Sequence, residues 1–135
     1  MELHIFRHGE TNWNVEGRAQ SHMGSKLTKK GVKQAKVLSN KIKDIKFKKI
    51  YSSSSLRARQ TSEIIWPNRH KEIIYLDILG EIFLGPWEGK LYKDIALTDP
   101  ESHQNFFKKP HLFSLKGAES FESLTNRASK AINKL

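Results

Sequence analysis

The chain has 135 residues, of which 37% are apolar and 28% are charged, and this length fits one compact domain better than two. It contains no cysteine, which excludes disulfides, zinc–thiolate sites and thiol nucleophiles. No run approaches the roughly 20 apolar residues that a membrane span needs, and the first residues lack the basic and then apolar order of a signal peptide. We therefore expect one domain over residues 1–135, a cytoplasmic location and no membrane partner.

The charge balance favours anionic ligands. The 24 Lys and Arg residues outnumber the 14 Asp and Glu residues, and the formal net charge is +10. Most of the excess comes from lysines between Lys26 and Lys49. Aromatic residues do not alternate with these lysines as they do in binders of single-stranded nucleic acid, and no helix-turn-helix or zinc-finger pattern is present. We interpret the run as a solvated face, and a nucleic-acid partner is the less favoured alternative.

Strands and helices are predicted to alternate over the first 76 residues. The β-prone run 3–6 predicts a buried first strand, and the polar stretch 7–27 predicts a long functional loop. Thr28 is the predicted N-cap of a helix whose apolar positions recur from Val32 to Ile45. Residues 47–52, 56–66 and 72–76 then predict a strand, a helix and a third strand. This alternation indicates an α/β fold, a mainly parallel sheet flanked by helices, with ligands bound at the carboxyl ends of the strands.

The pattern is less regular beyond Leu79. Short helices are predicted over residues 92–97 and 100–107, and a last helix is predicted to begin at Ser120. The apolar positions of this last helix continue to Leu135 without a glycine cap or a polar tail. We therefore expect the fold to be incomplete at its C-terminal end.

Three chemically informative segments are predicted to meet at one edge of the sheet. Arg7 and His8 directly follow the first predicted strand. A neutral imidazole can attack phosphorus, and a neighbouring guanidinium can bind phosphoryl oxygens in bidentate fashion. Arg57 or Arg59 can enter the same pocket from the start of the second helix. Glu81 lies in a turn that follows a glycine, where a carboxyl group is suited to protonate a leaving alkoxide.

Together these residues resemble the histidine phosphatase superfamily, in its phosphoglycerate mutase-like branch. The resemblance rests on four motifs in chain order: Arg7-His8-Gly9-Glu10-Thr11 with Trp13-Asn14, Arg57 between Tyr51-Ser52-Ser53 and Gln60-Thr61, Leu79-Gly80-Glu81 with Trp87-Glu88-Gly89, and Gly117-Ala118-Glu119-Ser120. Because the four motifs span nearly the whole chain in the family's order, they are far more specific together than any one of them alone.

The resemblance implies a role for each site residue. His8 is the residue that becomes phosphorylated, Glu81 is the proton donor, and the phosphate group and the rest of the substrate are bound by Arg7, Asn14, Gln20 and Arg57. It implies a phosphomonoesterase that acts on a small phosphorylated metabolite through a phosphohistidine, without a metal or another cofactor. By the same comparison Arg59 is a surface residue, Glu88 holds a loop by bonding backbone amides, and Trp13 and Trp87 pack beneath the loops.

Two departures from the family pattern leave alternatives open. The family has a second catalytic histidine in a strand after the last helix, and no residue of this chain occupies that position; a noncatalytic module that binds a phosphate ligand is therefore one alternative. The loop after the first motif has Ser21 and Gly24 in place of a usual glycine and aspartate, and it lacks the Phe-x-Gly-Trp run of the mutases. The missing run and the short approach to Gly117 resemble the phosphatase members, with a phosphoglycerate mutase-type isomerase as the other alternative, whereas Ser21 and Gly24 leave the substrate side of the loop open. The ester that is cleaved and the oligomeric state are left open.

Overall fold

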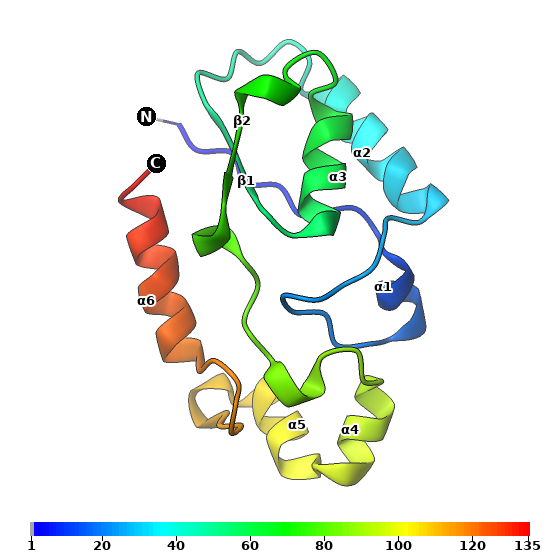
Figure 1. Ribbon diagram of the computed structural model, residues 1–135, viewed down its shortest axis with the longest axis vertical. Coiled ribbons are helices and arrows are strands. Elements are labelled where there is room, and N and C mark those ends of the chain that lie inside the picture. The colour runs from blue at the N-terminus through cyan, green and yellow to red at the C-terminus, as the bar shows by residue number, and fades with distance from the viewer. Residues whose placement is uncertain (1) are drawn as a thin grey trace.

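The computed structural model describes residues 2–135 and has parallel strands combined with helices (Figure 1). The helices are α1 (Asn12–Glu16), α2 (Lys29–Lys41), α3 (Leu56–Ile65), α4 (Tyr92–Thr98), α5 (Pro100–Lys108) and α6 (Phe121–Ile132), and the strands are β1 (Ile50–Ser53) and β2 (Ile73–Leu76). Single 3-10 turns occur at η1 (His70–Glu72), η2 (Asp77–Leu79), η3 (Gly85–Trp87) and η4 (Pro110–Leu112). β1 and β2 pair in parallel, from Ile50 opposite Ile73 to Ser53 opposite Leu76, which confirms the α/β class.

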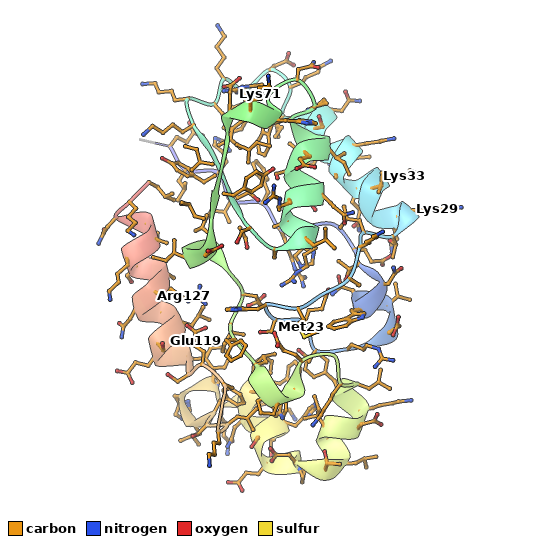
Figure 2. All side chains as sticks on the ribbon, viewed as in Figure 1. Met23, Lys29, Lys33, Lys71, Glu119 and Arg127 are labelled. Atoms are coloured by element: carbon orange, nitrogen blue, oxygen red, sulfur yellow. The ribbon has the colours of Figure 1, made fainter. Side chains whose placement is uncertain are left out.

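Helices α2 and α3 pack on each other, and α3 also contacts β1, whereas α6 lies on the opposite side of the two strands (Figure 1). The predicted cap of α2 is confirmed, because the Thr28 hydroxyl accepts a hydrogen bond from the Gly31 amide. The helix turns Ala35 toward a core that also contains Ile65 and aromatic side chains. Its lysines are exposed, as expected; Lys33 lies on the outer face of α2 in Figure 2.

The predicted strand over residues 3–6 is wrong. Among the described residues the sheet contains only β1 and β2, so this segment makes no ladder of backbone hydrogen bonds. Its side chains still alternate: Phe6 packs against the rings of Phe47 and Trp66, whereas Leu3 is 48% and Ile5 83% exposed. The β-prone residues thus produce an alternating segment that is buried on one side only, because a strand also requires a partner edge.

A second core forms below the sheet around α4 and α5. Ile82, Leu84, Trp87 and Ile95 are buried there, with partly buried aromatic side chains packed against them. The segment from β2 to η3 therefore crosses from one core to the other, and it carries Glu81 on the way. Figure 1 shows this crossing as the green chain between the upper and lower halves of the molecule.

The last helix begins where the sequence predicts it and ends earlier. The Ser120 hydroxyl caps α6 by accepting a hydrogen bond from the Ser123 amide. Phe121 and Leu124 pack on the lower core and Ala131 is buried, but α6 ends at Ile132, which is 55% exposed. The apolar stripe predicted to continue to Leu135 is therefore only partly buried.

The loop predicted over residues 7–27 contains a short helix that the sequence analysis missed. Thr11 and Asn14 form a capping box at the start of α1, and Gly17, with φ of 71°, ends the helix in the left-handed conformation. Five residues are too few to show a hydrophobic period.

Between residues 2 and 135 no helix is long and apolar enough to cross a membrane.

Candidate active site

A pocket of about 430 Å³ opens where the segment after Phe6 meets α2 and α3. Its lining consists of Arg7, His8, Gly9, Glu10, Asn14, Gln34, Ala35, Leu38 and Thr61. Three of the sequence-predicted site residues, Arg7, His8 and Asn14, line this cavity. The other three, Gln20, Arg57 and Glu81, are not among its lining residues. Thr61 is a residue of this lining that the sequence analysis did not single out.

The environment of His8 fixes the state of its imidazole. Nδ1 lies 2.7 Å from the carbonyl oxygen of Gly9, and because a carbonyl can only accept, Nδ1 carries the hydrogen. A neutral ring then has its lone pair on Nε2. Burial lowers the pKa of His8 below its ordinary value of 6.5; the bond to Gly9 acts in the other direction, the charges of Arg57 and Arg7 lower it further, and Glu81 raises it. The net shift favours the neutral, nucleophilic ring near neutral pH.

The peptide of Gly9 is held by α3 and α2. Its amide donates to the Thr61 hydroxyl at 3.0 Å, and that hydroxyl donates to the Arg57 carbonyl at 2.7 Å. A Cβ atom on Gly9 would come within 2.5 Å of the Gly31 carbonyl oxygen, so only glycine fits. The carbonyl that orients His8 is therefore part of a tightly packed contact between three segments.

Arg57 is a buried cation whose nitrogens are only partly used. The residue is 4% exposed, and its Nη2 donates to the Ser21 carbonyl at 3.0 Å and its Nη1 to the Met23 carbonyl at 3.4 Å. Its Nε is buried and has no hydrogen-bond partner among the described residues. The guanidinium can lie this close to the loop because Gly24 has no side chain; a Cβ atom at Gly24 would lie 2.8 Å from Nη1. Neutral carbonyls do not balance the charge, so the guanidinium is suited to hold an anion.

Glu81 is exposed, and its Oε1 accepts a hydrogen bond from the Ile82 amide at 2.9 Å. Its charge raises the pKa of His8 and of Tyr92, although burial is the larger cause of the shift in Tyr92. Burial has the largest effect on the pKa of Arg57 and lowers it; the charge of Glu81 has the next largest effect and raises it. After burial and the bond to Gly9, the charges of Arg57, Arg7 and Glu81 thus all act on the pKa of His8.

Asn14 and Gln20 lie beside this group and already have partners. The Asn14 side-chain oxygen accepts from the Thr11 amide at 3.0 Å. The Thr11 hydroxyl lies 3.0 Å from that oxygen and 2.8 Å from the Gln20 side-chain oxygen, and its single hydrogen is donated to one of the two. Asn14 is exposed and lines the pocket, whereas Gln20 lies next to Gly24.

The supporting residues behave as the sequence predicts. Glu88 accepts hydrogen bonds from the His22 amide at 2.8 Å and the Met23 amide at 3.0 Å, which confirms that it holds the loop. Arg59 is exposed and stacks over the Tyr75 ring at 4.2 Å. Trp87 is buried in the lower core, and Trp13 packs on Gly89. No group of three or more acidic or histidine side chains within residues 2–135 is arranged to hold a metal ion.

A comparison with protein-family models matches residues 3–135 to one family, described as the histidine phosphatase superfamily (branch 1). The chain belongs to this superfamily. The fold of the chain matches that of Bacillus stearothermophilus YhfR, with 40% identity and a TM-score of 0.90 over 95% of the chain. The phosphoglycerate mutase-like fold expected from the motifs is therefore confirmed.

The relatives of the chain include several proteins named as phosphatases. It is 31% identical over its whole length to the adenosylcobalamin/alpha-ribazole phosphatase of Salmonella typhimurium, and 33% identical over 94% of its length to phosphoserine phosphatase 1 of Hydrogenobacter thermophilus. It spans 67% and 60% of those two proteins and 63% of the YhfR chain. The family and the fold are thus shown.

Proposed function

We propose that the pocket binds the phosphate group of a small phosphomonoester and that Nε2 of His8 accepts the phosphoryl group. The observation that carries this proposal is the hydrogen bond from His8 Nδ1 to the Gly9 carbonyl, which leaves the lone pair on Nε2 in a ring whose pKa is lowered. Neutral imidazole is the form that can act as a nucleophile. The named phosphatases among the relatives support hydrolysis as the overall reaction.

The two arginines are assigned to the charge of the phosphoryl group. In phosphoryl transfer the protein acts mainly by positioning and by stabilising negative charge on the equatorial oxygens. Arg57 is buried and held by two loop carbonyls, so it offers a preorganised positive charge, one that already acts on His8. Arg7 is exposed at the pocket and supplies a second positive charge.

Glu81 is assigned to proton transfer. As the bond between phosphorus and the ester oxygen breaks and the bond to His8 Nε2 forms, the Glu81 carboxyl donates its proton to the departing oxygen. In the second half-reaction water attacks phosphorus, the resulting carboxylate takes the proton of that water, and the bond to Nε2 breaks. Free phosphate and the original enzyme are then restored, and no metal ion or other cofactor is required.

A noncatalytic module that binds a phosphate ligand is the second candidate. Of the histidines in the part of the chain that the structure describes, only His8 lines the pocket, whereas the family uses two at this site. The arginines that hold the phosphate do not depend on a second histidine. Binding without transfer is therefore the outcome that this candidate predicts.

The proposal is tested by supplying phosphoserine, a phosphorylated three-carbon acid and p-nitrophenyl phosphate in turn. We expect free phosphate from at least one ester, no isomerised acid, and loss of product in His8→Gln. An isomer in place of phosphate would favour a mutase, in line with the 30% identity to the probable phosphoglycerate mutase GpmB of Escherichia coli O1:K1. Calorimetric binding of inorganic phosphate without any turnover would support the binding module.

A further inference from the structure

Arg127 of α6 holds the segment that carries Glu81. Three of its five N–H groups bind backbone carbonyls of this segment, and the other two bind Glu119. Nη1 donates to the carbonyls of Ile78 at 2.9 Å and Gly80 at 2.8 Å, and Nη2 donates to the Glu81 carbonyl at 3.2 Å. The remaining two donors, on Nε and Nη2, bind the two oxygens of Glu119 at 2.9 and 2.8 Å. Figure 2 shows Arg127 and Glu119 together beside this segment.

Glu119 completes the attachment from the other side of the turn. Its Oε2 accepts from the Phe83 amide at 3.1 Å, and its own amide donates to the Phe83 carbonyl at 2.6 Å. The hydrogen bond from Arg127 lowers the pKa of Glu119 and raises that of Arg127, so the two stay ionised together. The Glu119 side chain is only 12% exposed and that of Arg127 23%. The pair thus fixes the backbone both before and after Glu81.

The Glu81 carboxylate depends on this backbone for its direction. Its hydrogen-bond partner in the structure is the amide of Ile82, the next residue, so the side chain moves with the local peptide plane. The residues after the turn have an attachment of their own, because the Ser21 hydroxyl bonds both the Ile82 carbonyl and the Leu84 amide. Removing Arg127 therefore frees the 78–81 segment and leaves residues 82–84 attached.

We infer that Arg127 is a positioning residue for proton transfer by Glu81, acting through the carbonyls of residues 78, 80 and 81. This inference rests on the proposed function, in which Glu81 protonates the leaving oxygen. Proton transfer is sensitive to the distance between the donor and the reacting oxygen, because the donor must reach hydrogen-bond range of that oxygen. The guanidinium fork suits three carbonyls and a carboxylate at once, and lysine lacks that geometry.

Two esters with different leaving groups separate this role from a general effect on folding. An alkyl phosphate such as phosphoserine needs a proton on its leaving oxygen, whereas p-nitrophenyl phosphate releases a stable phenolate. In Arg127→Met we expect kcat for the alkyl ester to fall about 10- to 100-fold and kcat for the aryl ester to change less than about threefold. Arg127→Lys should show the same selectivity, and Lys130→Met, one turn further along α6, should leave both rates unchanged.

The same assays with Glu81→Gln distinguish a failure of this inference from a failure of the proposed function. A selective loss with the alkyl ester in Glu81→Gln but equal losses with both esters in Arg127→Met would overturn the positioning role alone. No selectivity in Glu81→Gln, or no transfer from either ester in the unmodified chain, would overturn the proposed proton transfer and this inference with it.

Hydrogen exchange gives a readout that does not depend on turnover. In Arg127→Met, and in Glu119→Gln if the first variant folds poorly, we expect the amides of residues 79–81 to exchange at least tenfold faster. Amides within α3 should be unaffected. Unchanged exchange in the 79–81 segment would contradict the inference, because the segment would then be held without Arg127.

Discussion

Nδ1 of His8 lies 2.7 Å from the carbonyl oxygen of the next residue, Gly9. This contact selects the tautomer with a free Nε2, and it comes from the backbone, so no partner side chain is needed to orient the ring. The Gly9 peptide is fixed in turn by the Thr61 hydroxyl and by the close approach of Gly31. The chemistry proposed for His8 thus depends on the packing of α2 and α3 beneath it.

The pKa of His8 predicts the acid limb of the activity profile. Protonation at Nε2 removes the lone pair, so kcat/KM should fall as pH falls. Burial, together with the charges of Arg57 and Arg7, outweighs the opposing effects of the Gly9 bond and Glu81, so the pKa is lowered. The fall should therefore be centred below pH 6.5, the ordinary value. A profile of kcat/KM centred above that value would contradict the burial of the ring.

The same shift affects folding. Between the lowered pKa of folded His8 and 6.5, the unfolded chain binds more protons at this site than the folded chain. The contribution of the His8 pKa shift to the free energy of unfolding is therefore fully present above pH 6.5. It is lost as pH falls through the lowered pKa of the folded chain. Denaturant titrations should show that the chain loses more stability than His8→Gln as pH falls through this range, and equal losses in the two would contradict the lowered pKa.

Thr61→Val should destabilise the chain by about 1–3 kcal/mol, because it leaves the buried Gly9 amide without an acceptor. Thr61→Ser keeps the hydroxyl and should lose less than half as much. The free energy of unfolding from urea titration gives the comparison. Equal losses in the two variants would show that the methyl group, and not the hydrogen bond, determines the effect.

Gly31→Ala tests the contact between α2 and the segment after His8. Helix propensity alone predicts a gain of about 1 kcal/mol. The new Cβ would, however, lie 2.1 Å from the Glu10 carbonyl oxygen, and we expect the clash to dominate, for a net loss of about 1–3 kcal/mol. Asn40→Ala, at an exposed position of the same helix, is the matched control and should be neutral or stabilising. A stabilised Gly31→Ala variant would contradict this packing.

Arg57→Lys tests the buried cation. Lysine keeps the positive charge but lacks the planar guanidinium, which can donate two parallel hydrogen bonds to a phosphate. The Kd for inorganic phosphate should therefore rise about 10- to 100-fold in calorimetry. Arg59→Lys is the control, because Arg59 lies two residues along α3 and is exposed over Tyr75. Similar affinities in the two variants would place the phosphate away from Arg57.

Local signals in the sequence predicted the elements well where they had tertiary support. The cap at Thr28, the start of the last helix at Ser120 and the parallel pairing of β1 with β2 are found as expected. The run 3–6 was assigned wrongly because β propensity reports side-chain preference and does not report whether a partner strand is available. Helix α1 was missed because five residues carry no readable period.

The site was predictable as residue types and not as contacts. The motif positions of His8, Arg57 and Glu81 predict a shared pocket. In the structure His8 lines the pocket, whereas Arg57 and Glu81 are not among its lining residues and act on the pKa of His8 through their charges. Thr61 and Arg127 could not be assigned, since their roles are hydrogen bonds to backbone atoms about 50 residues away in sequence. Thr61 does fall inside a family motif, which was the one signal available for it.

The most direct test of the account is covalent labelling of the imidazole. The chain is incubated with an aryl phosphate that carries labelled phosphorus, quenched in alkali, where phosphohistidine is stable, and digested for mapping. We predict acid-labile label in the peptide that contains His8 and none in His8→Gln. Ester hydrolysis that persists in His8→Gln, or label that maps to another residue, would contradict the account.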